Sequence, residues 1–152
     1  MEIGDKIPEI LGRDANGKEI KSSDYRGKTF ALYFYPKDNT PGCTSQACSL
    51  KEGYHDLQNA GLEVIGVSVD DEKSHQKFIT KYELPFPLIA DTDKKLVEAF
   101  GVWGEKKMYG RTYFGTYRTT FIIDEEGKVE HIITPKSIKV KEHAAQLLKL
   151  VK

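Results

Sequence analysis

Two cysteines five residues apart carry the clearest chemical potential in this sequence. Cys43 and Cys48 are the only cysteines among its 152 residues. A pair of neighbouring thiols can bind a metal or exchange electrons through a disulfide. Structural zinc needs four Cys or His ligands, and iron–sulfur clusters need four thiolates. Because the four histidines are scattered without ligand spacing, we expect no metal and no cofactor, and redox chemistry is favoured.

The residues before Cys43 predict that its thiol lies in the first turn of a helix. Thr40 is a favourable N-cap residue, and Pro41 then takes the first helical position, where a missing N–H costs nothing. Cys43 becomes the third helical residue, where free backbone N–H groups and the helix dipole favour an anion. Helix N-termini favour the thiolate form of cysteine. The sequence therefore predicts an activated sulfur at residue 43.

The same segment also has a purely structural interpretation. A cysteine in a helix is commonly a small buried hydrophobic residue, and Thr40 and Pro41 fit an ordinary helix cap equally well. For this segment alone, the structural and the functional interpretations are evenly balanced. The second thiol at Cys48 favours the functional interpretation, because helix capping does not explain two neighbouring thiols.

The elements expected around this segment form an α/β fold with a mixed sheet and helices on both faces. Residues 30–35 and 62–69 are apolar runs typical of buried strands, and apolar residues at helical spacing lie between them up to Gly61. This strand–helix–strand unit predicts parallel pairing. Asn16-Gly17 is expected to supply both positive-φ residues of a tight turn. The other expected elements are hairpins over residues 9–20 and 119–133, a short strand at 88–89, and helices over 78–82, 96–100 and 138–151.

Charge and hydropathy exclude several classes of function. Lys plus Arg and Asp plus Glu both number 23, so the formal net charge is zero, whereas nucleic-acid binders usually carry a basic excess. Basic and aromatic residues do alternate in residues 104–118, a pattern that can bind single strands. The neutral chain favours a glycine-punctuated loop over the active site instead. We therefore expect no nucleic-acid partner.

The sequence predicts one cytoplasmic domain over residues 1–152. The first residues contain neither the basic nor the apolar region of a secretory signal. No apolar run approaches the roughly 20 residues that span a bilayer, so no membrane partner is expected. A reducing compartment keeps thiols reduced, so the two cysteines do not predict a structural disulfide.

The segment from Pro36 through Thr40 to Cys43 resembles the active-site signature of the peroxiredoxins. With Cys48 five residues later, it is similar to their bacterioferritin comigratory protein branch, also called the Q type. The likeness covers nearly the whole chain, in family order. It includes residues 4–8, the block YFYPKDNTPGCT, and residues 66–70, 84–88, 109–110 and 118–124.

The resemblance implies a thioredoxin-like fold with an N-terminal β-hairpin extension, and it implies a thioredoxin-dependent peroxidase. The Cys43 thiolate would attack hydrogen peroxide or an organic hydroperoxide and become a sulfenic acid. Thr40 and Arg118 would stabilise charge on the leaving oxygen, and Pro36 would shield the sulfur from water. Cys48 would then form a disulfide with Cys43, reduced by thioredoxin or a similar dithiol. Members of this branch are often monomers, so a monomer is expected.

Two other functions stay open from the sequence. A thioredoxin-like disulfide oxidoreductase would use C-x-x-C, whereas this chain has C-x4-C. Thioredoxins also place a proline just before a strand facing the cysteines, and this chain has none between Pro87 and Pro135. The other alternative is a non-enzymatic thiol redox sensor.

Without the family resemblance, Arg118 is typical of a solvated surface arginine.

A disulfide between Cys43 and Cys48 cannot form within an intact helix. Residues five apart lie about 7.5 Å along the axis and roughly 140° around it, which separates their Cα atoms by about 8.6 Å. A disulfide tolerates about 7 Å at most. We therefore expect a reduced protein that is helical through residues 43–48. Either the first turn or the stretch around Cys48 must open before the sulfurs meet, and Gly42 and Gly53 lower that cost.

Overall fold

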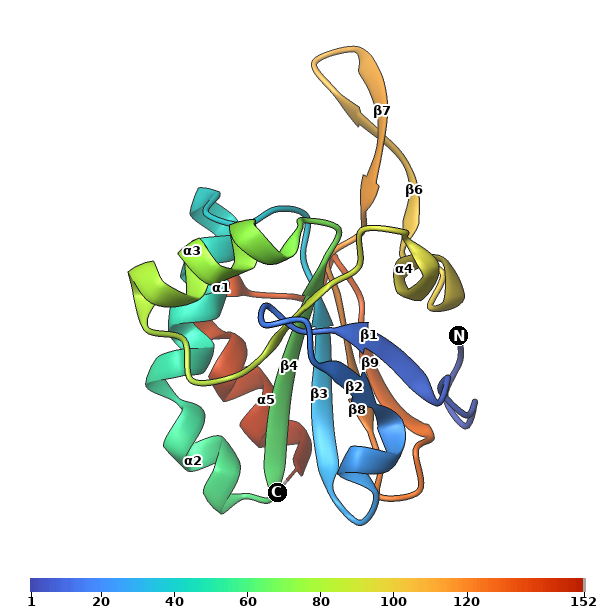
Figure 1. Cartoon of the computed structure of the whole chain (residues 1–152), viewed down its shortest axis with the longest axis vertical. Helices are drawn as coiled ribbons and strands as arrows, with labels where there is room; N and C mark the ends of the chain where they lie inside the picture. Colours follow the sequence, from blue (N-terminus) through green and yellow to red (C-terminus); the bar gives the residue numbers. More distant parts are fainter. Residues whose placement is uncertain (152) are drawn as a thin grey trace.

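A five-stranded mixed sheet forms the centre of the computed structural model, which describes residues 1–151 (Figure 1). The central strand, β3 (Thr29–Phe34), runs parallel to β4 (Leu62–Ser68) and antiparallel to β8 (Thr119–Ile123). β5 (Leu88–Ala90) extends the parallel side, and β9 (Val129–Ile133) extends the antiparallel side. The predicted parallel pair and the predicted second hairpin are confirmed.

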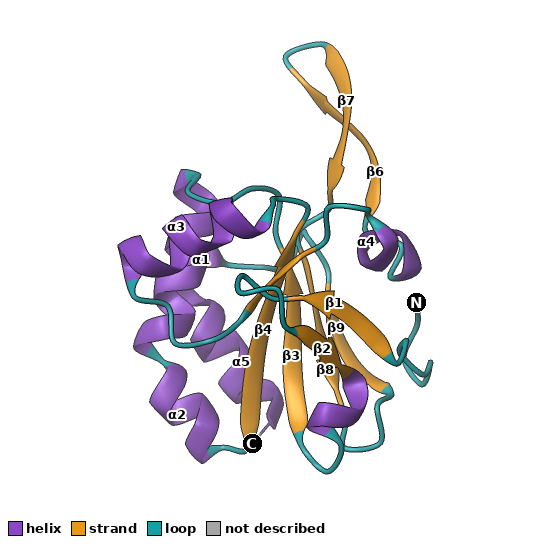
Figure 2. Cartoon of the chain, viewed as in Figure 1, coloured by secondary structure: helices purple, strands orange, loops and turns teal. Residues whose placement is uncertain are grey.

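Helices cover one face of this sheet, and a mixture of elements covers the other (Figure 2). The helical layer contains α1 (Pro41–Glu52), α2 (Tyr54–Asn59), α3 (Glu72–Tyr82) and α5 (His143–Val151). The opposite layer contains α4 (Lys95–Ala99), the hairpin of β1 (Ile10–Arg13) and β2 (Glu19–Lys21), and the 3₁₀ turn Ser22–Tyr25.

Alternation along β3 explains why its sequence is apolar throughout. Tyr33 and Ala31 belong to the cluster under the helical layer, whereas Leu32 and Phe34 belong to the cluster on the opposite face. A strand covered on both faces needs apolar residues at every position. The end of this buried strand leads directly into the segment that contains Cys43.

The helix expected to run up to Gly61 is divided in two at Gly53. α1 ends at Glu52, and α2 begins at Tyr54. A Cβ at residue 53 would lie 2.6 Å from the Cβ of Ala144 in α5, so the close approach of α5 requires glycine here. Gly61 itself has φ +83° just after α2, as expected for a residue that ends a helix.

The first hairpin is present, but its turn differs from the prediction. Of the two residues expected at positive φ, only Gly17 (+78°) has it. The Asp14 carboxylate organises the turn instead, because its Oδ1 accepts hydrogen bonds from the backbone N–H groups of Asn16 and Lys18 at 2.9 and 3.0 Å. Side-chain hydrogen bonds to Asp14 therefore stabilise the turn, in place of a second residue at positive φ.

The prediction of a loop over residues 104–118 is wrong. These residues form an additional antiparallel hairpin, β6 (Trp103–Met108) and β7 (Arg111–Thr116), which projects away from the sheet (Figure 1). Its turn residues Tyr109 and Gly110 both have positive φ, which suits a two-residue hairpin turn. Gly104 is required by packing, because a Cβ there would lie 2.5 Å from the Tyr117 hydroxyl.

The C-terminal helix begins later than expected. Val140–Glu142 form a 3₁₀ turn, and α5 begins at His143 rather than at residue 138. No helix within the described residues 1–151 is long and apolar enough to cross a membrane.

Candidate active site

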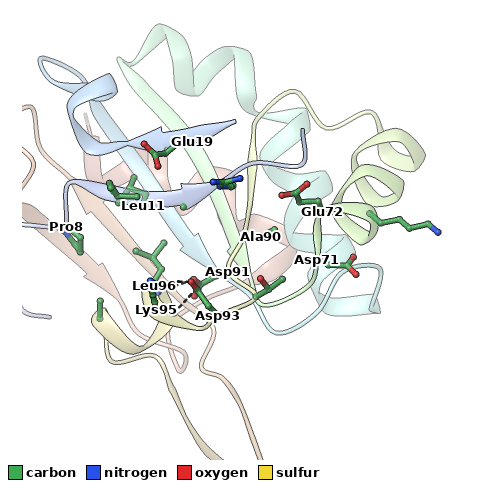
Figure 3. A pocket seen from close by; sticks show the side chains of 16 residues that line it. Pro8, Leu11, Glu19, Asp71, Glu72, Ala90, Asp91, Asp93, Lys95 and Leu96 are labelled. Atoms are coloured by element: carbon green, nitrogen blue, oxygen red, sulfur yellow. Dashed lines mark hydrogen bonds and ion pairs between the residues drawn. The ribbon is translucent and has the colours of Figure 1, made fainter. Parts of the chain in front are cut away.

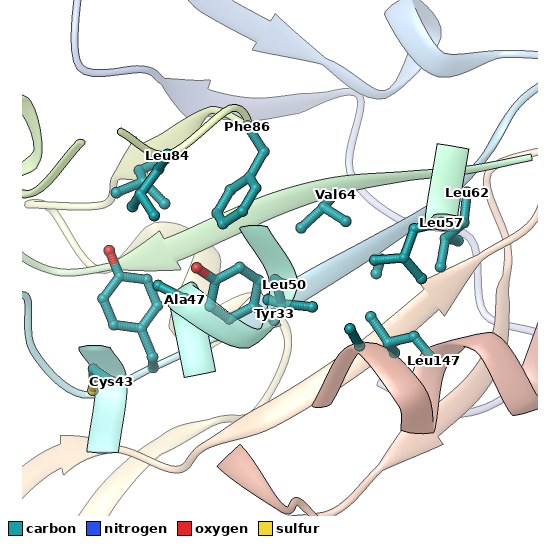
Figure 4. Close-up of a cluster of buried hydrophobic side chains, with 14 of the residues drawn as sticks. Tyr33, Cys43, Ala47, Leu50, Leu57, Leu62, Val64, Leu84, Phe86 and Leu147 are labelled. Atoms are coloured by element: carbon teal, nitrogen blue, oxygen red, sulfur yellow. The ribbon is translucent and has the colours of Figure 1, made fainter. Parts of the chain in front are cut away.

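Cys43 lies in the first turn of α1, as its sequence context predicts. α1 begins at Pro41, Thr40 is its N-cap residue, and Cys43 is the third helical residue. The side chain is only 1 % exposed and lies at one end of the apolar cluster under the helical layer (Figure 4). Both cysteines are free thiols. The helix N-terminus therefore presents a reduced and shielded sulfur at the end of β3.

Arg118 brings a positive charge to this sulfur from a distant part of the chain. Its Nη2 donates to Cys43 Sγ at 3.3 Å, and its Nη1 donates to Gln46 Oε1 at 2.5 Å. Arg118 directly precedes β8, whose pairing with β3 carries it to the start of α1. Gly42 leaves room for it, since a Cβ there would lie 3.2 Å from Nη2. The guanidinium therefore contacts the sulfur, and the alternative interpretation of Arg118 as a solvated surface arginine is wrong.

Gln46 is a site residue that the sequence reasoning did not assign. It is fully buried, and its amide oxygen holds Arg118. Its Nε2 and the hydroxyl of Tyr33 find no hydrogen-bond partner within residues 1–151. Burial raises the pKa of Tyr33 well above its ordinary value, and the charge of nearby Cys43 adds to the effect. The spacing of three residues after Cys43 was the available signal for Gln46, because it places both side chains on one helix face.

Thr40 and Pro36 lie on the loop that joins β3 to α1. The Thr40 hydroxyl donates to the carbonyl of Lys37 at 2.9 Å, and the Thr40 carbonyl accepts the first helical hydrogen bond from Thr44 N at 2.8 Å. A threonine has one hydroxyl proton, so donation to a substrate oxygen requires this side chain to release Lys37. Pro36 is half-buried, two residues beyond the end of β3.

Cys48 lies about one and a half turns beyond Cys43 in the same helix. α1 is continuous from Pro41 to Glu52, which confirms the helix expected through residues 43–48 in the reduced protein. Cys48 is half-buried, whereas Cys43 is buried. The regular helix holds the two Cα atoms about 8.6 Å apart, beyond the range of a disulfide. A bond between them therefore requires part of α1 to open.

Lys106 adds a second cation on the side of Arg118. It is half-buried in β6, and its Nζ donates to the carbonyl of Thr116 at 3.1 Å. Burial and then repulsion from Arg118 lower the pKa of Lys106, while attraction to Cys43 acts in the opposite direction. The base of the projecting hairpin therefore contributes to the positive field around the sulfur.

A separate cleft of about 880 Å³ lies between the first hairpin, the start of α3 and α4 (Figure 3). Its buried carboxylate already has structural partners: Asp91 accepts from the backbone N–H groups of Leu96 and Val97 at 3.1 and 2.8 Å. Asp71 at its rim accepts from Ser74 N and caps α3. None of the predicted site residues lines this cleft. Within residues 1–151, no cluster of three or more His, Cys, Asp or Glu side chains could hold a metal ion.

Comparison with known proteins identifies related chains over the full length. The model of the AhpC/TSA family matches residues 3–132. Peroxiredoxin Bcp of Bacillus subtilis is 44 % identical over 152 residues, which is 100 % of this chain and 96 % of the relative. Peroxiredoxin Bcp of Escherichia coli is 42 % identical over 132 residues, which is 87 % of this chain and 85 % of the relative.

Solved structures of related proteins have the same fold as this chain. A cysteine-to-serine mutant of Xylella fastidiosa PrxQ has a TM-score of 0.89 at 34 % identity, covering 99 % of this chain and 95 % of that one. The Xanthomonas campestris bacterioferritin comigratory protein, in its trapped intermediate and ligand complexes, has a TM-score of 0.84 at 33 % identity, with 97 % of each chain covered. The expected thioredoxin-like fold is confirmed.

Proposed function

Since the chain belongs to the AhpC/TSA family and to its bacterioferritin comigratory protein branch, we propose that Cys43 attacks the peroxide and Cys48 resolves the product. Members of this branch are thiol-dependent peroxidases, and the protein is one of them. The Xanthomonas relative is described by its alkyl peroxide reduction activity, so alkyl hydroperoxides are the first substrates to test. The observation that carries the assignment is the contact between Arg118 and the Cys43 sulfur.

The first step is attack by the Cys43 thiolate on the terminal oxygen of the hydroperoxide. An S–O bond forms, the O–O bond breaks, and the departing oxygen takes a proton and leaves as an alcohol or as water. Arg118 supplies N–H donors at the sulfur and stays charged at every relevant pH. Donors fixed where negative charge develops lower the barrier without reorganising. Thr40 adds a hydroxyl at the helix N-terminus, and Pro36 narrows access of water.

The second step joins the two cysteines. The Cys48 thiol attacks the sulfenic sulfur of Cys43, a disulfide forms, and the hydroxyl group leaves as water. Part of α1 opens to let the sulfurs meet, because the intact helix holds them too far apart. An external dithiol then reduces the disulfide by thiol exchange. We assign this role to thioredoxin or a similar dithiol protein.

We place the enzyme in the cytoplasm, as a monomer that acts as one domain. Both cysteines are free thiols, and a disulfide that must be reduced in every cycle requires a reducing compartment. Cys43, Cys48 and Arg118 all come from one chain, so the proposed cycle needs no second copy.

A coupled assay tests this function. Thioredoxin, thioredoxin reductase and NADPH are mixed with the protein and cumene hydroperoxide, and NADPH oxidation is followed. We expect sustained turnover that stops in Cys43→Ser. Oxidation of one equivalent without turnover would instead indicate a redox sensor, and reduction of insulin disulfides without peroxide consumption would indicate a disulfide oxidoreductase. Turnover with glutathione alone would contradict the proposed reductant.

A further inference from the structure

A buried ion pair fastens the loop before α1 to the start of α3. His75, in the first turn of α3, is fully buried, and Asp38 in the loop is 7 % exposed. Their atoms Nδ1 and Oδ2 lie 2.6 Å apart. The other ring nitrogen of His75, Nε2, lies 2.9 Å from the carbonyl oxygen of Ile89 in β5. Neither residue of this pair takes part directly in the two steps proposed for Cys43 and Cys48.

The contacts of His75 define its protonation state. Both of its partners are acceptors, a carboxylate and a backbone carbonyl, so both ring nitrogens must carry protons to satisfy them. Asp38 is a carboxylate, because Tyr35 Oη at 2.5 Å and Ser74 Oγ at 2.8 Å donate to it as well. The pair is therefore an imidazolium and a carboxylate sealed between the loop, α3 and β5.

The pKa of His75 is raised in these surroundings. Burial alone would lower it, but the hydrogen bond and charge of Asp38 and the carbonyl of Ile89 outweigh burial. Asp70, just beyond β4, adds negative charge, and the ring of Tyr35 packs beside the imidazolium with 6.5 Å between centroids. These groups face His75 from the loop, from β5, and from the ends of β3 and β4.

Further contacts hold the same loop along its length. The backbone N–H of Asp38 donates to Asp70 Oδ2 at 2.8 Å, and Ser68 Oγ donates to that oxygen at 2.7 Å. Asn39 has φ +60°, and its Oδ1 accepts from Tyr82 Oη at 3.2 Å and Lys81 Nζ at 3.3 Å. Both ends of α3 therefore grip two consecutive loop residues.

We propose that Asp38 and His75 are positioning residues for peroxide reduction. Thr40 directly follows Asp38 and Asn39 in the chain. Its carbonyl accepts the first hydrogen bond of α1, the helix that carries Cys43. The backbone of Arg118 directly precedes β8 and so belongs to the sheet, whereas its guanidinium also donates to Gln46 of α1. A loop that shifts relative to the sheet therefore separates Cys43 and Thr40 from Arg118. The inference rests on the proposed role of Cys43.

The pair also makes the site sensitive to a rise in pH. The folded-state pKa of His75 lies above its ordinary value of about 6.5. The pair therefore contributes its full stability below about pH 6.5, and this contribution is lost as the pH rises through the folded-state pKa. Neutral His75 can donate to only one of its two acceptors, so either the loop contact or the β5 contact is lost.

Variants of the pair provide the test. Asp38→Asn, His75→Gln and the double variant are compared by anaerobic stopped-flow mixing with peroxide, with Trp103 fluorescence as the signal. We expect each single variant to slow the peroxide step by about 10- to 100-fold, the size of effect that a small misplacement produces. The double variant should lose no more than the worse single one, because the two residues act together. Disulfide formation after the peroxide step should keep its rate.

Asp91→Asn is the matched control. Asp91 is also a buried carboxylate that accepts hydrogen bonds, but its donors are the backbone N–H groups of Leu96 and Val97 in α4, on the opposite face of the sheet. It should lower the melting temperature and leave the peroxide rate constant unchanged. Equal peroxide rates in folded Asp38→Asn and Asp91→Asn, or additive losses in the double variant, would overturn the positioning role.

A measurement on the wild-type protein tests the proposal even if the variants fail to fold. The ¹⁵N signals of His75 are followed against pH, beside the peroxide rate constant. We expect both ring nitrogens protonated at neutral pH, and a loss of rate at the pH where His75 loses its proton. A neutral His75 at pH 7, or a rate that ignores its titration, would contradict the proposal. A wild-type protein in which Cys43 fails to react would instead defeat the proposed function.

Discussion

The two cysteines share one helix but have different surroundings. The first turn of α1, with Cys43, is held by polar contacts: Arg118 reaches the sulfur at 3.3 Å, and the loop before it is gripped by α3. The half of α1 that contains Cys48 packs through buried apolar side chains such as Leu50 and ends at Gly53. Its polar contacts come from less buried groups: Lys51 Nζ donates to the Tyr82 carbonyl at 2.9 Å, and Ala144 N donates to Ser49 Oγ at 3.2 Å. Cys48 itself is half-buried. The chain thus holds the attacking thiol through charged contacts and places the half-buried resolving thiol nearer to the glycine that ends the helix, where we expect the opening.

The largest effect is expected from removing the fixed thiol. Cys43→Ser should abolish peroxidase activity, because a neutral hydroxyl with no adjacent base cannot replace a thiolate as nucleophile. Peroxide consumption in the presence of an excess of dithiol measures this directly. Activity retained in Cys43→Ser would move the chemistry to another residue.

A smaller loss is expected when the contact to the sulfur is removed. Arg118→Met should slow the peroxide step by roughly 10²–10³, the typical cost of losing a preorganised donor at developing charge. It should also slow the alkylation of Cys43, because no guanidinium then stabilises negative charge on the sulfur. Arg111→Met, on the exposed face of β7, is the control and should behave like wild type. An unchanged rate and alkylation profile in Arg118→Met would contradict the role of Arg118.

Removing the second thiol should separate the two regions functionally. Cys48→Ser keeps the first turn of α1 intact, so it should consume one equivalent of peroxide at the wild-type rate and then stall as sulfenic acid. Excess peroxide should carry Cys43 on to sulfinic acid. Turnover with thioredoxin should be poor. Mass spectrometry that finds no oxidised product on Cys43 would count against this division of roles.

The subtlest expected difference concerns the helix itself. In the disulfide form, amide exchange should accelerate more over residues 47–52 than over residues 36–41, since the buried contacts of Asp38 to His75 and Ser74 hold the latter. The reduced form should protect residues 43–48 throughout. Peptide-resolved hydrogen exchange compares the two forms. Equal protection of residues 42–50 in both would show that no helix opening accompanies the disulfide.

The sequence predicts those parts of the site that local signals encode. Thr40 and Pro41 mark a helix start within three residues of Cys43, so the position of this thiol could be derived from capping preferences alone. The contact of Arg118 joins residues 75 positions apart, and only the resemblance to a known family pointed to it. Spacing within one segment carries no information on such a long-range pair.

Other features depend on packing between distant elements. Gly53 divides the expected helix because α5 approaches it, and a glycine in a helical pattern does not reveal its distant neighbour. The glycines of residues 104–118 suggest a loop, although Gly104 and Gly115 are paired across a hairpin. His75 and Asp38 lie 37 positions apart, so their pairing could not be derived from the sequence.

The order of oxidation tests the central claim most directly. Reduced wild-type protein is mixed with one equivalent of peroxide, quenched at successive times with dimedone, which traps sulfenic acid, and analysed by peptide mass spectrometry. The proposed mechanism predicts a dimedone adduct on Cys43 that appears first and declines as the Cys43–Cys48 disulfide accumulates. An adduct on Cys48 that precedes any on Cys43, or accumulation of oxidised protein without a Cys43–Cys48 disulfide, would contradict it.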